Sequence, residues 1–146
     1  MAESRELSTR ECELLLRAGF AGRIAVSTPA GPHLVPVNYT VVDDAIIVRT
    51  SPYSLLGTYG REAMLAFGID GLDRYHRRGW SVQARGRVHA VIDRAEVERI
   101  REVAEPQPLA DGARTLYLRL RWTELTGRKL GADFNPTRDL PVAADA

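Results

Sequence analysis

Residues 79–93 read GWSVQARGRVHAVID and alternate apolar with polar side chains for most of that length. Such an alternation predicts one β-strand with a buried face and a wetter face. At about 14 residues, the predicted strand is far longer than the usual five or six. A strand of this length suits one that bends through a small barrel, with Gly86 where a side chain would obstruct a tight bend or a close backbone neighbour. We therefore expect the other strands to wrap around this one.

The residues before this segment predict one helix and several closely spaced strands. Ser8 and Glu11 have the spacing of a capping box, which starts a helix of about three turns that ends near Gly19. A short helical turn is expected at 55–60, and the polar segment 71–78 is expected to be an exposed connection. Strands are predicted at 23–28, 34–42, 45–50 and 64–70.

The residues after this segment predict a second helix at 95–104 and then strands at 115–122 and 124–130. The fold class is therefore mainly β, with six to seven antiparallel strands in a barrel and two flanking helices. Residues 1–130 are expected to form one domain. Periodicity is lost in residues 131–146, which are expected to be a C-terminal tail, mobile or lying against a partner.

Charge and hydropathy exclude several classes of protein. The 146 residues carry 20 basic against 19 acidic side chains, a formal net charge of +1, which argues against a large nucleic-acid footprint. No apolar run approaches the roughly 18–20 residues of a membrane helix, and the N-terminus has no hydrophobic signal region. We expect a cytoplasmic protein with no membrane or nucleic-acid partner.

Cysteine and histidine usage gives no reactive or metal centre. Cys12 is the single cysteine and is expected to be a small core residue on the first helix. His33, His76 and His89 are too scattered in the sequence to predict a metal site. No Ser-His-Asp or Cys-His set can be assembled from spacing alone, so the catalytic residues stay unknown.

The most suggestive candidate site is the end of the strand at 45–50. Thr50 closes that strand, and the loop from Ser51 to Ser54 brings hydroxyl groups and free amides to the entry of the short helical turn. Such groups suit an oxyanion, including phosphate, and Arg49 could add the positive charge. The alternative is that Arg49 is a surface residue at the end of a strand.

Three more residues on the predicted strands are candidates for contact with a ligand. Pro36 has no backbone donor, so its strand must lie at a sheet edge, at a bulge, or beside something such as a ligand. Asn38 lies among apolar residues, and its amide is expected to have a partner, either backbone or ligand. Trp80 is either a core or interface aromatic residue or a cofactor contact.

The chain resembles the flavin-binding split-barrel family that includes pyridoxamine phosphate oxidases, especially its short bacterial members. The resemblance runs from about Leu7 to Lys129 and rests on six short pieces in the same order. These pieces are GRIAV at 22–26 after the first helix, PVNY at 36–39, IVRT at 47–50, FGID at 67–70, GWSV at 79–82 with GR at 86–87, and TGR at 126–128.

The resemblance implies a split β-barrel homodimer that holds a flavin mononucleotide (FMN) in each of two grooves between the subunits. It implies that the backbone of Pro36, Val37 and Asn38 runs along the isoalloxazine ring. It further implies an FMN-dependent oxidoreductase whose substrate the sequence does not identify. The other residues that it places at the cofactor are Arg49, Thr50, Ser51, Ser54 and Leu55 around the ribityl phosphate, and Trp80 and Ser81 near the cofactor or the subunit interface.

The sequence differs from the family directly after Thr50. Flavin-binding relatives commonly continue with a glycine, a small hydroxyl residue, a lysine and a leucine, where this chain has Tyr53, Ser54, Leu55 and Leu56. A phosphate here loses one cationic partner, worth roughly 1.5–3 kcal/mol. This leaves open a non-catalytic or sensing protein of the same fold that binds a deazaflavin or haem, or a structural dimer with no cofactor.

Overall fold

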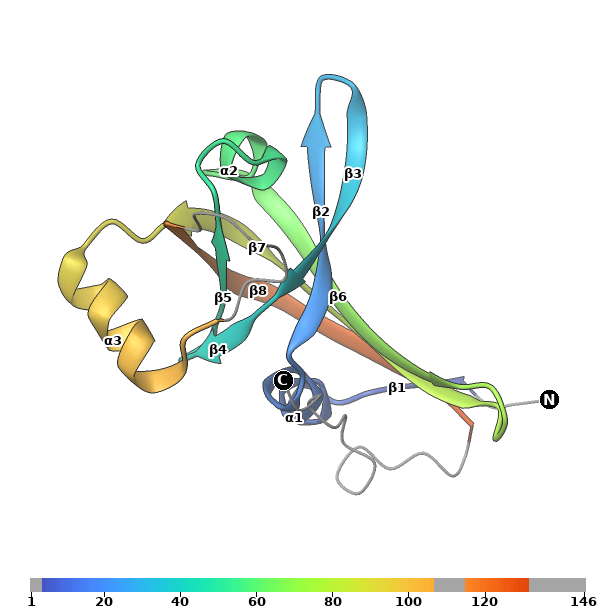
Figure 1. Cartoon of the computed structure of the whole chain (residues 1–146). Helices are drawn as coiled ribbons and strands as arrows, with labels where there is room; N and C mark the ends of the chain where they lie inside the picture. Colours follow the sequence, from blue (N-terminus) through green and yellow to red (C-terminus); the bar gives the residue numbers. More distant parts are fainter. Residues whose placement is uncertain (1–3, 107–114, 132–146) are drawn as a thin grey trace.

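The computed structural model describes residues 4–106 and 115–131 and shows one antiparallel sheet of eight strands curled into a half-barrel (Figure 1). The helices are α1 (Thr9–Ala18), α2 (Leu55–Tyr59) and α3 (Arg94–Ala104). The strands are β1 (Ser4–Glu6), β2 (Ala21–Thr28), β3 (Gly31–Asn38), β4 (Thr40–Val42), β5 (Ala45–Thr50), β6 (Met64–Asp73), β7 (Arg78–Ala90) and β8 (Leu116–Leu130). The prediction of a mainly β split barrel with flanking helices is confirmed.

Strand β7 lies at the middle of the sheet, whose order is β3-β2-β6-β7-β8-β5-β4 with β1 paired to β8. The long alternating segment is therefore the strand around which the others are arranged, as predicted. It ends at Ala90 rather than at Asp93, because the chain turns there toward α3 and leaves Ile92 88% exposed. The described residues form eight strands, where six to seven were predicted, and the additional strand β1 lies at the N-terminal end. They also form three helices where two were predicted, because the short helical turn expected at 55–60 is the helix α2.

Gly86 lies where β7 passes closest to β8. A Cβ atom on Gly86 would be 2.0 Å from the carbonyl oxygen of Arg121 and 3.0 Å from the Cα of Trp122. Both atoms belong to the backbone of a paired strand, so neither can move aside without breaking the pairing. The predicted role of Gly86, to admit a close backbone neighbour, is confirmed.

Strand β8 is one continuous strand where the sequence predicted two, at 115–122 and 124–130. The register along β7 shifts between Arg85 and Gly86, and Thr123 is the extra residue of a β-bulge. The bulge lets β8 bend without interrupting its pairing with β7. The predicted break is therefore an irregularity within a strand.

Half of the polar segment 71–78 is the paired end of a hairpin, and the other half, 74–77, is an exposed turn, as the sequence predicted for the whole segment. Strands β6 and β7 stay in register up to Asp73 opposite Arg78. The Asp73 carboxylate accepts a hydrogen bond from the backbone N–H of His76 and lies 3.6 Å from the Arg78 guanidinium. The charges that suggested a loop therefore stabilise the hairpin turn.

The predicted strand 34–42 is divided at Tyr39 into β3 and β4, which lie at opposite ends of the sheet order. The Tyr39 ring is buried, and its hydroxyl donates to the carbonyl oxygen of Leu16 on α1 at 2.5 Å. The Tyr39 N–H donates to the carbonyl of Phe20, and the chain then pairs with β5. This corner brings the two edges of the sheet toward each other.

Helix α1 closes the main core, as its sequence predicted. The Ser8–Glu11 capping box is present, and Cys12 is completely buried. A second, smaller cluster lies under α3, on the other side of β5, and consists of Val42, Ala45, Ile47, Ile100 and Tyr117. In the described part of the chain, no helix is long and apolar enough to cross a membrane. Of the predicted tail, only Gly131 falls within the described residues.

Candidate functional site

Pro36 lies on an edge strand, which is one of the three settings that the sequence left open for it. It is exposed and lies opposite Arg23 of β2, and the other side of β3 has no strand partner among the described residues. Val37 is buried in the main core, so only its backbone can face a ligand. This edge therefore presents backbone groups and an exposed proline ring where the resemblance expects the isoalloxazine ring.

The Asn38 side chain carries an unpaired acceptor. Its Oδ1 atom is buried and accepts no hydrogen bond from any described residue. A buried polar atom without a partner costs about 1–3 kcal/mol, so native structures rarely retain one without a reason. The sequence left open whether the Asn38 amide bonds to backbone or to a ligand. No described backbone group donates a hydrogen bond to its oxygen.

Thr50, Ser51 and Ser54 are brought together by their own hydrogen bonds. The Ser54 hydroxyl donates to the Ser51 carbonyl at 2.8 Å and accepts from the Gly57 N–H at 2.9 Å, which caps α2. Because its proton is used there, the Thr50 hydroxyl, 2.7 Å away, is the donor of their shared bond. These hydroxyls therefore fix the shape of the loop.

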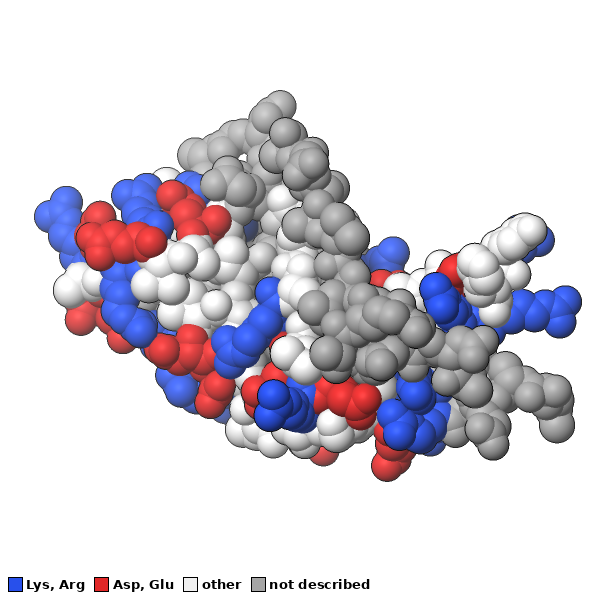
Figure 2. Space-filling view, turned by 90° about the horizontal axis from the view of Figure 1, so that it is seen from below, with Lys and Arg blue, Asp and Glu red and all other residues white. Residues whose placement is uncertain are grey.

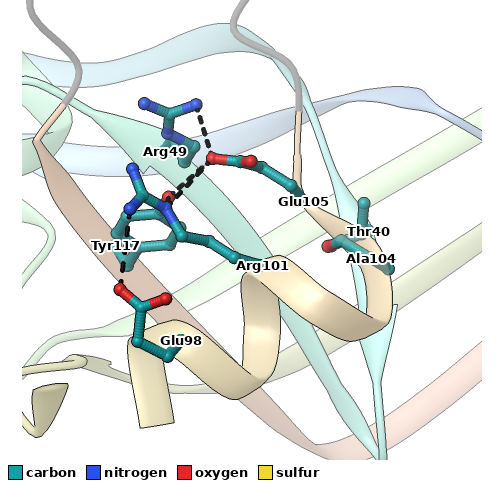
Figure 3. A network of polar contacts seen from close by, with 7 residues as sticks. All are labelled: Thr40, Arg49, Glu98, Arg101, Ala104, Glu105 and Tyr117. Atoms are coloured by element: carbon teal, nitrogen blue, oxygen red, sulfur yellow. Dashed lines mark hydrogen bonds and ion pairs between the residues drawn. The ribbon is translucent and has the colours of Figure 1, made fainter. Parts of the chain in front are cut away.

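Arg49 lies on the opposite face of β5 from Thr50, because successive side chains of a strand alternate. Its guanidinium donates to Glu105 Oε1 at 3.1 Å and lies 5.3 Å from the centre of the Tyr117 ring. Figure 3 shows the contact between Arg49 and Glu105 as a dashed line. Glu105 also accepts from the Tyr117 hydroxyl at 2.9 Å. The predicted phosphate residue Arg49 is thus in an ion pair and has no hydrogen bond to the Thr50 or Ser54 hydroxyls.

The two residues that differ from the family lie on either side of Ser54. Tyr53 is 94% exposed, and its N–H donates to the Ser51 hydroxyl at 3.2 Å. Leu55 packs against the main core. The end of β5 therefore has an exposed aromatic ring and an apolar side chain where relatives commonly have a glycine and a lysine.

Trp80 and Ser81 lie on opposite faces of β7. Trp80 is buried in the main core. Its indole nitrogen lies 2.5 Å from the position that a Cβ atom on Gly71 would take, so the ring fills the space that the glycine leaves. Ser81 is exposed on the outer face and lines three adjoining hollows with volumes of about 540, 310 and 200 Å³. We call this the Ser81 surface; its other polar or small lining residues include Ala25, Ala66, Gly68, Gln83, Thr126 and Arg128.

The groups with the most perturbed pKa values are structural. Burial raises the pKa of the Cys12 thiol to about 11 and raises that of Tyr39 further above its ordinary value. Both lie in the core around α1. Within residues 4–106 and 115–131, no three metal-ligating side chains come together. The site thus consists of hydrogen-bonding groups, with no acid–base pair among the residues that the sequence singled out.

Sequence reasoning missed Glu105 and Tyr117. Glu105 directly follows the predicted helix at 95–104, and Tyr117 lies in the predicted strand at 115–122, and neither position indicated a role in the site. Their partner Arg49 is 56 residues from Glu105, so no local spacing could show the contact. Gln83 is a polar position of the long alternating segment and Thr126 belongs to the TGR piece at 126–128, and the sequence assigned neither to the site.

Comparison with known families gives one match over most of the chain. Residues 8–129 match the family model described as pyridoxamine 5'-phosphate oxidase. A curated relative, an uncharacterized protein of Mycobacterium tuberculosis, is 32% identical over 106 residues, which are 69% of this chain and 70% of that protein.

Solved structures share the fold. An FAD binding protein from Mycobacterium smegmatis superposes with a TM-score of 0.72 at 28% sequence identity, covering 85% of this chain and 96% of that one. A FAD-binding protein from Mesorhizobium loti superposes with a TM-score of 0.67 at 19% identity, covering 90% and 99% of the two chains.

Proposed function

The chain belongs to the pyridoxamine 5'-phosphate oxidase family, and from this we propose that it is a flavin-dependent oxidoreductase that holds its flavin between two copies of the chain. The observation that carries the proposal is the free edge of β3 with the unpaired Asn38 Oδ1 beside it. The similar M. smegmatis protein, which is described as binding flavin adenine dinucleotide (FAD), supports a flavin as the ligand.

The edge of β3 is chemically suited to an isoalloxazine ring. An unpaired strand edge offers N–H and C=O groups to any partner that presents the complementary pattern. The pyrimidine side of isoalloxazine carries one N–H donor between two carbonyl acceptors. Pro36 removes one backbone donor from this strand, which also disfavours a further strand in the same place. The ring end of the site therefore fits a flavin.

The Ser81 surface is our proposed contact with the second copy. Its largest hollow, about 540 Å³, is within the range of ligand sites in proteins. Small side chains such as Ala25, Ala66 and Gly68 leave room for another molecule to pack closely, and Leu34 at its rim is 70% exposed. A partner on this surface would cover Leu34 and help to enclose a ligand at the edge of β3.

In this proposal the flavin supplies hydride or electron transfer, and the protein supplies position and electrostatics. The backbone of β3 orients the ring, and the second copy excludes water from it. In this proposal no side chain at the site acts as an essential acid or base. The substrate class is left open by these residues.

A second candidate is a non-catalytic or sensing protein that binds a deazaflavin or haem in the same groove. The observation that favours it is the phosphate end of the site, where Leu55 offers no charge and Arg49 is paired with Glu105. The phosphate of FMN, the cofactor that the resemblance implies, would have to compete with the Glu105 carboxylate to bind Arg49.

A visible absorption spectrum tests the proposal. Purified full-length protein is measured before and after incubation with excess FMN or FAD and desalting, and we expect flavin bands to be retained. The matched variant Asn38→Leu should retain less flavin, because the ring then meets an apolar group. Protein that stays colourless with both flavins would overturn the proposal and direct the search to deazaflavin and haem. Size-exclusion chromatography of Ser81→Arg, which should elute as a monomer, tests the dimer contact.

A further inference from the structure

Glu105 is the centre of a charged cluster at the end of α3 (Figure 3). Its Oε1 accepts hydrogen bonds from Arg49 and from the Tyr117 hydroxyl, and the Arg101 Nε lies 3.4 Å away. Arg101 also donates to the Tyr117 hydroxyl at 3.2 Å. The carboxylate thus has two arginines and one phenol around it, and the Arg49 and Glu105 side chains are both more than two-thirds buried.

The backbone around Glu105 is anchored separately. The Thr40 hydroxyl donates to the carbonyl of Ala104, the residue before Glu105, at 2.9 Å. Pro106, the residue after Glu105, is completely buried. The carboxylate is therefore carried to Arg49 by a fixed piece of backbone, unlike an ion pair between two flexible surface side chains.

We propose that Glu105 is a specificity-determining residue that makes the site select against flavins ending in a phosphate monoester. This rests on the proposed function, because it concerns which flavin the groove takes. A terminal phosphate that approaches Arg49 meets the Glu105 carboxylate, which already accepts a hydrogen bond from the guanidinium and either has to be displaced or stays beside the phosphate. If the phosphate binds without displacing it, two anions share one cation.

Other flavins are less affected by Glu105. Riboflavin has the same ring and ribityl chain but no phosphate, so it does not compete with Glu105 for hydrogen bonds from Arg49. In FAD each phosphate has one ester bond and one anhydride bond to the other phosphate and carries a single negative charge, and the adenosine adds contact area elsewhere. The loss of the lysine at Leu55 acts in the same direction, since it removes the other cation that could hold a terminal dianion.

The test compares two ligands on each protein. The dissociation constants of FMN and riboflavin are measured by fluorescence quenching on full-length wild-type protein and on Glu105→Gln, which keeps an acceptor oxygen but removes the charge. We expect Glu105→Gln to bind FMN about tenfold more tightly, about 1.4 kcal/mol, with riboflavin affinity unchanged within about twofold. The ratio of the two constants is insensitive to a general loosening of the fold, which would affect both ligands alike.

Two further variants serve as controls. Glu98→Gln removes an acidic charge from α3 whose ion-pair partner among the described residues is Arg101, at 3.7 Å, and it should leave the ratio unchanged. Tyr117→Phe removes one donor that holds the carboxylate and should shift the ratio in the same direction by about twofold. An unchanged ratio in Glu105→Gln, with flavin bound, would overturn this inference alone. No binding of either flavin by any variant would overturn it together with the proposed function.

Discussion

The two faces of strand β5 are built differently, although their residues alternate along one six-residue strand. The inner face, with Ile46 and Val48, belongs to the main core that the whole half-barrel surrounds. The outer face, with Ile47 and Arg49, is covered by α3 and its small cluster. Figure 2 shows that acidic and basic side chains are interspersed on the side of the molecule that carries α3, at the left.

This difference shows where the chain can vary its chemistry without losing its fold. A side chain on the inner face has neighbours from several strands and helices, so changing it disturbs all of them. One on the outer face has α3 as its principal cover, and a helix that is held by long polar side chains can adjust. The pairing of Arg49 with Glu105, which we propose affects ligand choice, lies on this outer face.

The largest effect is expected for Ile46→Ala on the inner face. Ile46 is fully buried in the main core, and truncation leaves a cavity whose walls are held by paired strands. We expect a loss of about 3–5 kcal/mol in the free energy of unfolding, measured by urea denaturation. A loss below about 1 kcal/mol would show that the half-barrel collapses more readily than its packing implies.

A smaller loss is expected for the neighbouring Ile47→Ala on the outer face. Ile47 is 1% exposed, nearly as buried as Ile46, so exposure does not distinguish the two residues. Because α3 can move toward the cavity, we expect about 2–3 kcal/mol, again by urea denaturation. Equal losses for the two variants would contradict the proposed difference between the faces.

Local patterns predicted most of what lies on the inner face. The bounds of β5 and the Ser8–Glu11 capping box follow from adjacent residues, and both are where the sequence placed them. The division of the strand 34–42 was missed because the hydrogen bond from Tyr39 to Leu16, 23 residues away, fixes it. An alternating pattern cannot show a corner that depends on a distant carbonyl group.

The candidate site was only partly predictable for the same reason. Thr50, Ser51 and Ser54 lie close in sequence, and the structure joins them as one hydrogen-bonded loop. The sequence also favoured an edge for the strand of Pro36, because a missing N–H is a local property. The pairing of Arg49 with Glu105 has no such local sign, since it depends on where α3 packs.

At the end of β5, Thr50→Val tests the inner face without changing its size. Valine keeps the shape of threonine but removes the hydroxyl that donates to Ser54. Since Ser54 retains its bonds to Ser51 and Gly57, we expect a loss of only about 1 kcal/mol in the free energy of unfolding, measured by urea denaturation. Ser54→Ala, which removes the cap of α2 as well, should cost more; the reverse order would mean that the cap is not what shapes the loop.

The smallest effect is expected at the exposed rim of the outer face, where Arg99 of α3 holds Asp43 through two hydrogen bonds of 3.1 and 3.2 Å. These bonds lower the pKa of the Asp43 carboxyl below its ordinary value. Because the pKa is lower in the folded state, the ionised carboxylate stabilises the folded protein at pH values above its ordinary pKa of about 3.9. This contribution is lost as the pH falls through the depressed pKa. Carboxyl titration by NMR should give a higher Asp43 pKa, closer to its ordinary value, in Arg99→Gln, whereas the matched variant Arg94→Gln should leave it as low as in the wild type. An Asp43 pKa that stays as low in Arg99→Gln would mean that Arg119 and Arg121 of β8, rather than α3, set the electrostatics of this rim.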